Sequence, residues 1–235
     1  MIFRQLFEKN SSTYTYLLAD EDSREAVLID PVVDETDGYL RLLTELDLRL
    51  TVAMDTHTHA DHITALGKLR EATGCITLMG QQAGSACASG QFSDQQIIEV
   101  GKLTIRAIHT PGHTDDSYSF VLENDGQTYL FSGDTLLIRG TGRTDFQNGN
   151  ALDQYHSLFD VLLKLPDHTL VYPAHDYKGW TVSSVLEERR HNPRLQVTHA
   201  LEYKKIMDNL NLPNPKLMDI AVPANRSCGY AAAQE

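Results

Sequence analysis

The sequence predicts a mixed α/β fold in which two mixed sheets pack face to face and helices lie on the outside. Short runs of branched and aromatic residues, separated by polar turns, dominate the first two-thirds of the 235 residues. Leucines at helical spacing lie between some of these runs, so strands and helices alternate. Periodicity alone predicts only a mixed α/β class, and the order of the elements favours two sheets with helices outside.

Strands are expected where β-branched and aromatic residues cluster between turn residues. They are residues 2–7, 13–18, 26–29, 50–54, 75–79, 103–108, 117–122, 127–131 and 169–172. The first three form an opening meander, and the apolar run at 50–54 is typical of a buried strand. Asn-Asp-Gly at 124–126 favours a hairpin turn between two later strands.

Helices are expected where apolar residues recur every three or four positions. They are residues 37–46, 62–72, 152–164, 181–190 and 201–210. Gly74 and Pro166 end the second and third of these helices, and a proline-marked tail begins at Pro213. The sequence shows no internal repeat and no linker. We therefore expect residues 1–235 to form a single domain with a short C-terminal helical tail.

The chain is acidic, with 20 Lys and Arg against 32 Asp and Glu and a formal net charge of −12. This charge repels polyphosphates and anionic lipid headgroups, so binding to nucleic acid or to a membrane surface is not expected. No apolar run approaches the ~18 residues of a membrane span, and the first residues lack a leader pattern. Three cysteines are too few for a disulfide framework, which fits a reducing compartment. We therefore expect a cytoplasmic protein.

The strongest local signal is the sequence Thr-His-Thr-His-Ala-Asp-His at residues 56–62, directly after a predicted buried strand. It contains three imidazoles, His57, His59 and His62, and one carboxylate, Asp61. So dense a pattern rarely arises by chance. Neutral imidazole and carboxylate suit divalent metals such as zinc and iron, and alternate residues at a strand end project several ligands into one cleft.

Three further candidate ligands each follow a predicted strand and a turn. His113 follows a Pro-Gly turn, Asp134 stands in Ser-Gly-Asp, and His175 stands in Pro-Ala-His-Asp. Taken singly, His113 is undecided and Asp134 fits a helix or turn cap. Four strand ends that each offer a ligand indicate one composite metal cleft. The remaining histidines are left outside this site: His109, His156, His168, His191 and His199.

With these motifs in this order, the chain resembles the metallo-β-lactamase superfamily. Its αββα sandwich, two mixed sheets flanked by helices, presents such groups along one edge. Further stretches, which extend the similarity over essentially the whole chain, are similar to persulfide dioxygenases of the ethylmalonic-encephalopathy-protein type. They are IRGTGRTDFQ at 138–147, YPAHDY at 172–177, NPRL at 192–195, NLNLP at 209–213 and AVPAN at 221–225.

The resemblance implies an enzyme that oxidises glutathione persulfide with O2 and water to sulfite and glutathione at a mononuclear non-heme Fe(II). The iron ligands that it implies are His57, His113 and Asp134. Two imidazoles and one carboxylate form a facial triad, which leaves positions open for O2 and for the persulfide sulfur. One Fe(II) per chain is therefore expected.

The resemblance also implies roles for residues near these ligands. In related hydrolases the matching residues bind a second metal, whereas in persulfide dioxygenases they hold no metal. The resemblance therefore implies that four residues of this chain orient the iron ligands: His59, Asp61, His62 and His175. Tyr177 and Arg194 are implied as substrate-binding residues, because a guanidinium suits a glutathione carboxylate. Arg143 either binds substrate or fixes the loop after Asp134.

Two other functions stay open on the residues alone. Every side chain of a dinuclear site is present, so a dinuclear zinc thioester hydrolase of the glyoxalase II type is the main alternative. A metal- or thiol-binding sensor without turnover is the second. The sequence does not fix the physiological persulfide, the role of Cys228 or whether the chain forms a homodimer.

Overall fold

The computed structural model describes residues 1–213 and 217–230, which divide into two compact units. They are unit 1, which comprises Met1–Phe92, Ile98–Thr104 and the described part of Asn214–Glu235, and unit 2, which comprises Ser93–Ile97 and Ile105–Pro213. Each unit has a buried apolar cluster of its own. That the whole chain forms a single domain stays a prediction.

Six strands form the first sheet, in the order β1-β2-β3-β4-β5-β6. They are β1 (Ile2–Glu8), β2 (Thr13–Ala19), β3 (Glu25–Ile29), β4 (Arg49–Met54), β5 (Ile76–Gly80) and β6 (Gly90–Phe92). The first three pair antiparallel as the predicted meander, whereas β3 to β6 pair parallel. Parallel pairing brings the carboxyl ends of β3 and β4 to the same edge of the sheet.

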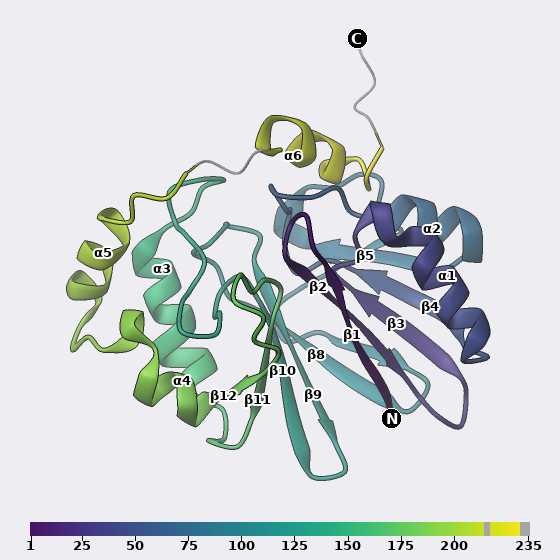
Figure 1. The fold of residues 1–235 in the computed structure, drawn as a ribbon, viewed down its shortest axis with the longest axis horizontal. Coiled ribbons are helices and arrows are strands. Elements are labelled where there is room, and N and C mark those ends of the chain that lie inside the picture. Colours follow the sequence, from purple (N-terminus) through teal and green to yellow (C-terminus); the bar gives the residue numbers. More distant parts are fainter. Residues whose placement is uncertain (214–216, 231–235) are drawn as a thin grey trace. The chain divides into compact units, whose positions relative to one another are not determined.

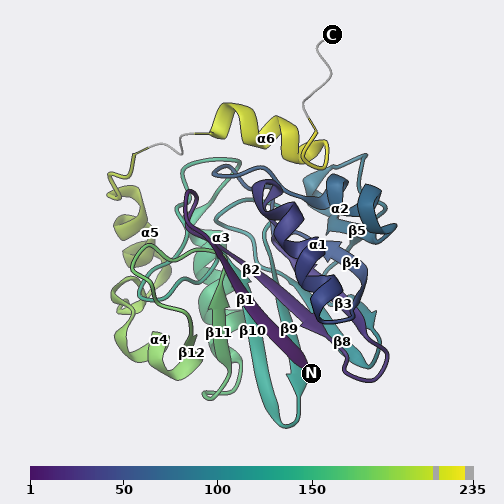
Figure 2. The ribbon, with the colours of Figure 1, turned by 45° about the vertical axis from the view of Figure 1, so that its right-hand side comes forward.

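The helices described in unit 1 are α1 (Thr36–Glu45), α2 (Leu66–Thr73) and α6 (Met218–Arg226). Figures 1 and 2 show α1 and α2 on the same face of the first sheet, where each connects two parallel strands. Leu43 of α1 and Leu69 of α2 pack against the strands in one buried cluster. Burial of each such leucine stabilises the unit by about 1.5–3 kcal/mol.

The second sheet has the order β12-β11-β10-β9-β8-β7. Its strands are β7 (Ile97–Val100), β8 (Leu103–His109), β9 (Tyr118–Asn124), β10 (Gln127–Gly133), β11 (Leu170–Pro173) and β12 (Ser183–Ser184). Strands β10 and β11 pair parallel, whereas β8 with β9, β9 with β10 and β11 with β12 pair antiparallel. Figure 1 labels the unit 2 helices α3 (Ala151–His156), α4 (Val185–His191) and α5 (Ala200–Asp208). Their buried apolar side chains form one cluster with side chains of β8, β9, β10 and β11. The predicted class, two mixed sheets flanked by helices, is confirmed.

Helix α2 begins later than the hydrophobic pattern predicts, at Leu66 instead of residue 62. Ile63 O accepts a hydrogen bond from Val33 N at 2.8 Å, and Ala65 N donates to Pro31 O at 2.7 Å. These bonds to the segment after β3 hold the preceding residues in a loop. The difference matters for function, because this loop contains the end of the predicted metal-binding motif.

Another helical prediction needs correction. The helix expected at 152–164 is α3 followed by a π turn at Ser157–Val161 and a 3-10 turn at Leu162–Lys164. The proline-marked tail contains α6, with Pro223 inside it. Strands β6, β7 and β12 were not expected, because two to four residues are too few to show a period.

Two of the three cysteines form a disulfide, which corrects the expectation of reduced cysteines. Cys87 and Cys228 are bonded although 141 residues separate them in the sequence. Cys75 is free and buried. A single long-range disulfide leaves no spacing pattern, so the sequence argument, which looked for a framework, missed it. The bond ties the segment after α6 to the segment between β5 and β6.

Tyr39 of α1 supports the backbone at the end of β3. Its hydroxyl accepts a hydrogen bond from Val32 N at 3.1 Å. It donates to Thr15 Oγ1 at 2.9 Å, because Thr15 gives its own proton to Asp30 O at 2.7 Å. Burial raises the pKa of Tyr39 to about 12, so the hydroxyl stays protonated at neutral pH.

Tyr39→Phe is expected to lower the free energy of unfolding by about 1–3 kcal/mol, because it leaves Val32 N and Thr15 without their buried partner. Urea unfolding measures the change. Tyr177→Phe is the matched control, because Tyr177 is 71% exposed and its substitution should change stability by less than about 0.5 kcal/mol. Equal stability of the two variants would contradict the role of Tyr39.

Candidate metal centre

In unit 1 the predicted metal-binding motif lies in the loop after β4, beside Asp30. The two meet because β3 and β4 end at the same edge, where Asp30 N donates to Met54 O at 2.9 Å. The buried Asp30 carboxylate accepts three hydrogen bonds from the loop, from Thr56 N at 2.6 Å, Thr56 Oγ1 at 3.0 Å and His59 Nε2 at 3.1 Å. One carboxylate therefore fixes the start of the motif.

His57 is oriented through the same carboxylate. Thr56 gives its hydroxyl proton to Asp30, so its oxygen accepts a hydrogen bond from His57 Nδ1, 3.0 Å away. The lone pair of the neutral His57 ring is then on Nε2. A histidine with one nitrogen committed as a donor presents the other nitrogen in the form that binds a divalent metal.

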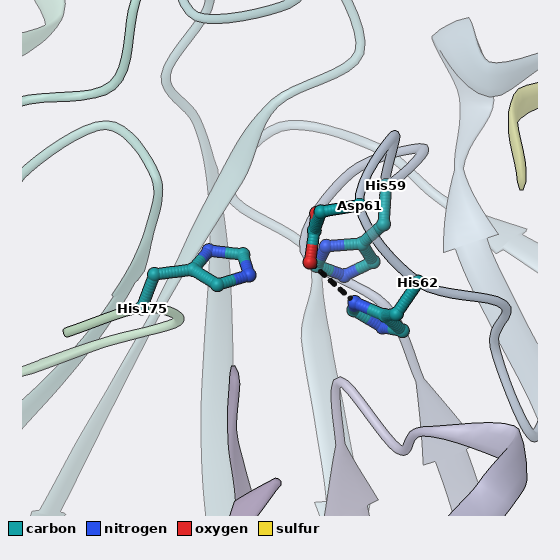
Figure 3. Close-up of side chains that lie close together, drawn as sticks. All are labelled: His59, Asp61, His62 and His175. Carbon is teal, nitrogen blue, oxygen red and sulfur yellow. Dashed lines mark hydrogen bonds and ion pairs between the residues drawn. The ribbon is translucent and has the colours of Figure 1, made fainter. Parts of the chain in front are cut away.

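Three more candidate ligand residues of unit 1, His59, Asp61 and His62, are drawn in Figure 3. One atom from each residue lies within 4.8 Å of the others, and His62 Nδ1 donates to Asp61 Oδ2 at 2.9 Å. Burial by itself would lower the pKa of His59. The charge and hydrogen bond of Asp30, together with the charges of Asp55 and Asp61, raise that pKa to about 9.

In unit 2 parallel strands again bring candidate ligands to one edge. The ends of β10 and β11 lie side by side, and Ala174 N donates to Gly133 O at 2.9 Å. Asp134 and His175 follow these ends, and His175 Nδ1 donates to Asp134 Oδ1 at 2.7 Å. The other oxygen, Asp134 Oδ2, lies 3.5 Å from His113 Nε2. Unit 2 thus brings three of the predicted residues together.

His113 is held by the loop that follows Asp134. Its Nδ1 donates to the carbonyl oxygen of Arg143 at 2.7 Å, so the neutral ring carries its lone pair on Nε2, the atom near Asp134. Gly142 makes this close approach possible. A Cβ at Gly142 would lie 2.3 Å from Asp134 O and 2.7 Å from His113 Nδ1.

Arg143 makes contacts that favour the loop-fixing one of its two expected roles. Its guanidinium forms two hydrogen bonds with the Asp145 carboxylate, at 2.6 and 2.8 Å, and donates to Pro213 O at 2.7 Å. It also lies over the Phe146 ring, 4.2 Å from the centroid. A substrate role for Arg143 stays a prediction.

The other two residues expected to bind substrate also lie in unit 2. Arg194 is half-buried and donates to the backbone oxygen of Thr141, and burial lowers the pKa of its guanidinium. Tyr177 is 71% exposed, and its ring stacks on that of His175 at a centroid distance of 6.2 Å. The protein therefore offers one partly desolvated cation and one accessible phenol.

Three residues that lie in or contact the unit 1 loops were not expected from the sequence. Asp30 follows the predicted strand 26–29 directly, so the strand-end argument used for Asp134 applies equally to it. Asp55 accepts a hydrogen bond from Thr64 Oγ1 at 3.1 Å. Asn225 reaches the loop from a segment about 160 residues away, and no local pattern indicates such a contact.

This architecture matches a known family over most of its length. Residues 10–175 match the family model of the metallo-β-lactamase superfamily. Proteins named persulfide dioxygenase ETHE1, mitochondrial, from Mus musculus, Bos taurus and Homo sapiens are each 50% identical over 230 residues, 97% of this chain and 89% of their own. The chain belongs to the ETHE1 persulfide dioxygenase family of the metallo-β-lactamase superfamily.

A solved structure supports the same assignment. The crystal structure of ETHE1 from Myxococcus xanthus is 56% identical, with a TM-score of 0.94, and the match covers 98% of this chain and all of that one. A hydroxyacylglutathione hydrolase from Dictyostelium discoideum is more distant, at 29% identity over 79% of this chain and 71% of its own. The family and the fold class expected from the sequence are confirmed.

Each unit thus carries histidines and carboxylates that could hold a metal, as the metallo-β-lactamase family model leads one to expect. Imidazole and carboxylate donors suit borderline divalent metals. The hydrogen bonds of the chain fit this use, because His57 and His113 each commit Nδ1 as a donor. Asp134 is likewise oriented by His175.

Gly142→Ala is expected to weaken metal binding by about 10- to 100-fold, because the added methyl would displace the Asp134 carbonyl or the His113 ring. Competition with a chelator measures the affinity. Gly140→Ala in the same loop is the control, because a Cβ there meets only Leu137 Cβ at 3.9 Å. If the two variants bound metal equally, the steric argument would be wrong.

Proposed function

We propose that the chain is a persulfide dioxygenase that oxidises glutathione persulfide with O2 and water to sulfite and glutathione. The observation that carries the proposal is 50% identity over 97% of the chain to proteins named persulfide dioxygenase. The hydrolase relative matches less of the chain at 29% identity, so similarity favours oxidation over hydrolysis. The overall reaction balances, because one O2 and one water supply the three oxygens of sulfite and two protons are released.

The proposed metal is one Fe(II) per chain, with His57, His113 and Asp134 as its ligands. A bound Fe(II) with three protein ligands supplies open positions where O2 and the persulfide sulfur meet. The protonation pattern of the two histidines supports these ligands. Hydrogen bonds to Thr56 and to the Arg143 carbonyl commit Nδ1 of the two histidines as donors, so Nε2 of each neutral ring is the ligand atom.

The neighbouring polar residues are proposed to orient these ligands. His175 holds Asp134 Oδ1 at 2.7 Å and thereby directs the carboxylate. His59 donates to Asp30, the carboxylate that also positions Thr56 and through it His57. Asp61 and His62 pair with each other. Loss of such an orienting partner typically weakens metal binding or activity by about 10- to 100-fold.

Arg194 is the proposed anchor for a carboxylate of glutathione. The Arg194 guanidinium donates to the backbone oxygen and the hydroxyl of Thr141, and burial partly desolvates it. A cation in this state gains more from an anionic ligand than an exposed one does. The exposed Tyr177 phenol is the proposed second contact with substrate. Arg143 is the weaker candidate, because its guanidinium already bonds to residues of the loop.

The cytoplasmic location expected from the sequence stays a prediction, and two observations weigh against it. No helix in the described ranges, 1–213 and 217–230, is long and apolar enough to cross a membrane. The three mammalian relatives are named mitochondrial, and the Cys87–Cys228 disulfide favours an oxidising compartment, so both observations weigh against the cytoplasm. A homodimer likewise stays a proposal.

The reaction is tested by oxygen uptake of the iron-loaded chain with glutathione persulfide. We expect one sulfite formed for each O2 consumed, and at least about a 100-fold loss of rate in His113→Ala, because a ligand is removed. His156→Ala is the control, since this exposed histidine forms a surface ion pair with Asp160 and is not a candidate ligand.

A different outcome would establish the alternative. Two zinc ions per chain, turnover of S-lactoylglutathione and no oxygen uptake would show a dinuclear thioester hydrolase. Saturable persulfide binding without any product would show a sensor. Equal oxygen uptake by the wild-type chain and His113→Ala would remove His113 from the mechanism.

Arg194→Ala is expected to raise KM for glutathione persulfide by about 10- to 100-fold with a smaller change in kcat, because a charged hydrogen bond to substrate is lost. Steady-state oxygen uptake gives both constants. A persulfide without carboxylates serves as the control, and its KM should not respond. A change confined to kcat would contradict the anchoring role.

A further inference from the structure

The buried side chain of Asn225 joins the C-terminal helix α6 to the metal-binding loop of unit 1. Its amide nitrogen donates to the carbonyl oxygens of His59 at 2.8 Å and His62 at 2.9 Å. Its amide oxygen accepts from Thr64 N at 2.8 Å. One fully buried side chain thus bonds the backbone on both sides of His62.

These three bonds require an amide in one orientation. Two backbone carbonyls can only accept, and one backbone N–H can only donate, so the NH2 group must face His59 and His62 and the oxygen must face Thr64. A carboxylate of the same shape would place an acceptor against two acceptors. Asn225→Asp therefore tests the hydrogen bonds with almost no change in volume.

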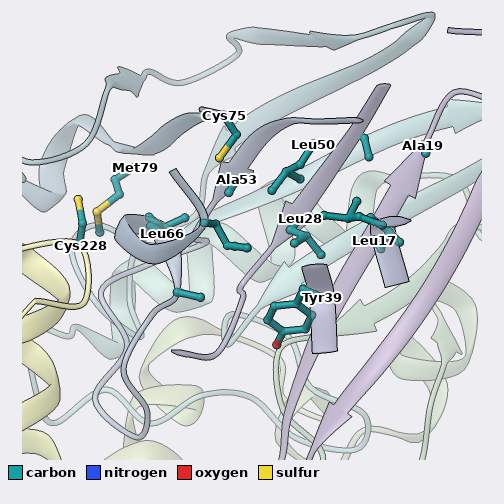
Figure 4. Packing of buried hydrophobic residues seen from close by; sticks show 14 residues of the cluster. Leu17, Ala19, Leu28, Tyr39, Leu50, Ala53, Leu66, Cys75, Met79 and Cys228 are labelled. Carbon is teal, nitrogen blue, oxygen red and sulfur yellow. The ribbon is translucent and has the colours of Figure 1, made fainter. Parts of the chain in front are cut away.

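The segment after Asn225 packs against the same loop and helix α2. Cys228 O accepts from Gly67 N at 2.9 Å. Gly229 lies so close that a Cβ there would be 2.1 Å from Thr64 O, and its φ of +86° also favours glycine. The Cys87–Cys228 disulfide attaches this segment covalently, and Figure 4 shows Cys228 in the same buried cluster as Leu66.

We propose that Asn225 is a positioning residue for the metal-binding loop and that the Cys87–Cys228 disulfide keeps it in place. Without Asn225 the carbonyls of His59 and His62 lose the amide that donates to both, so the backbone between them can shift and carry the side chains of the motif with it. The inference rests on the metal site of the proposed function but not on the oxidation reaction.

The test is the rate at which metal-loaded protein loses its metal to excess chelator, measured for iron and separately for zinc. Asn225→Asp and Asn225→Ala are expected to release metal about 10- to 100-fold faster than the wild-type chain. Melting temperatures are recorded for every variant. A chain that failed to bind iron would count against the proposed function. The zinc measurement would still test the role of Asn225.

A core variant separates positioning from general stability. Leu43→Ala removes a buried side chain of α1 in unit 1, at a position in the apolar cluster. It is expected to lower the melting temperature while leaving metal release unchanged. If release instead followed melting temperature across Leu43→Ala and the Asn225 variants, or if Asn225→Asp released metal at the wild-type rate, Asn225 would have no positioning role.

The disulfide is tested with Cys87→Ser, which removes the covalent bond and leaves Asn225 present. Metal release is expected to be faster than in the wild-type chain and slower than in Asn225→Ala. Cys75→Ala is the matched control, because Cys75 is free and buried in the same cluster. An unchanged rate in Cys87→Ser would overturn the proposed role of the disulfide.

Discussion

Parallel pairing of neighbouring strands is the constraint on which the metal-binding side chains depend. In each sheet two strands end at the same edge, so the polar residues that follow them become neighbours whatever their separation in the sequence. Asp30 and Thr56 meet in this way in unit 1, and Asp134 and His175 meet in unit 2. Antiparallel pairing would have placed the start of one strand beside the end of the other.

The chain also decides which nitrogen of each proposed histidine ligand carries the proton. Nδ1 of His57 donates to the Thr56 hydroxyl, which itself donates to Asp30. Nδ1 of His113 donates to a backbone carbonyl instead. Both routes leave Nε2 as the ligand atom. The same tautomer is therefore reached with a side chain in one unit and with the main chain in the other.

Local patterns predicted most strands and several helices, and they singled out the candidate metal ligands, because each candidate follows a strand and a turn within a few residues. His113 and His175 were found in this way. The predicted start of α2 was wrong, because the hydrogen bonds of Ile63 and Ala65 to the segment after β3 override the helical spacing of the sequence. Asn225 and the disulfide were missed for the same physical reason, since each depends on segments more than 140 residues apart.

The reach of Asn225 back to His59 has a consequence for biosynthesis. The two residues are 166 positions apart, so the ribosome makes the loop long before it makes the side chain that holds it. During that interval the hydrogen bonds from Asn225 to the carbonyl oxygens of His59 and His62 cannot form. The loop can therefore reach its final set of hydrogen bonds only after translation has passed α6.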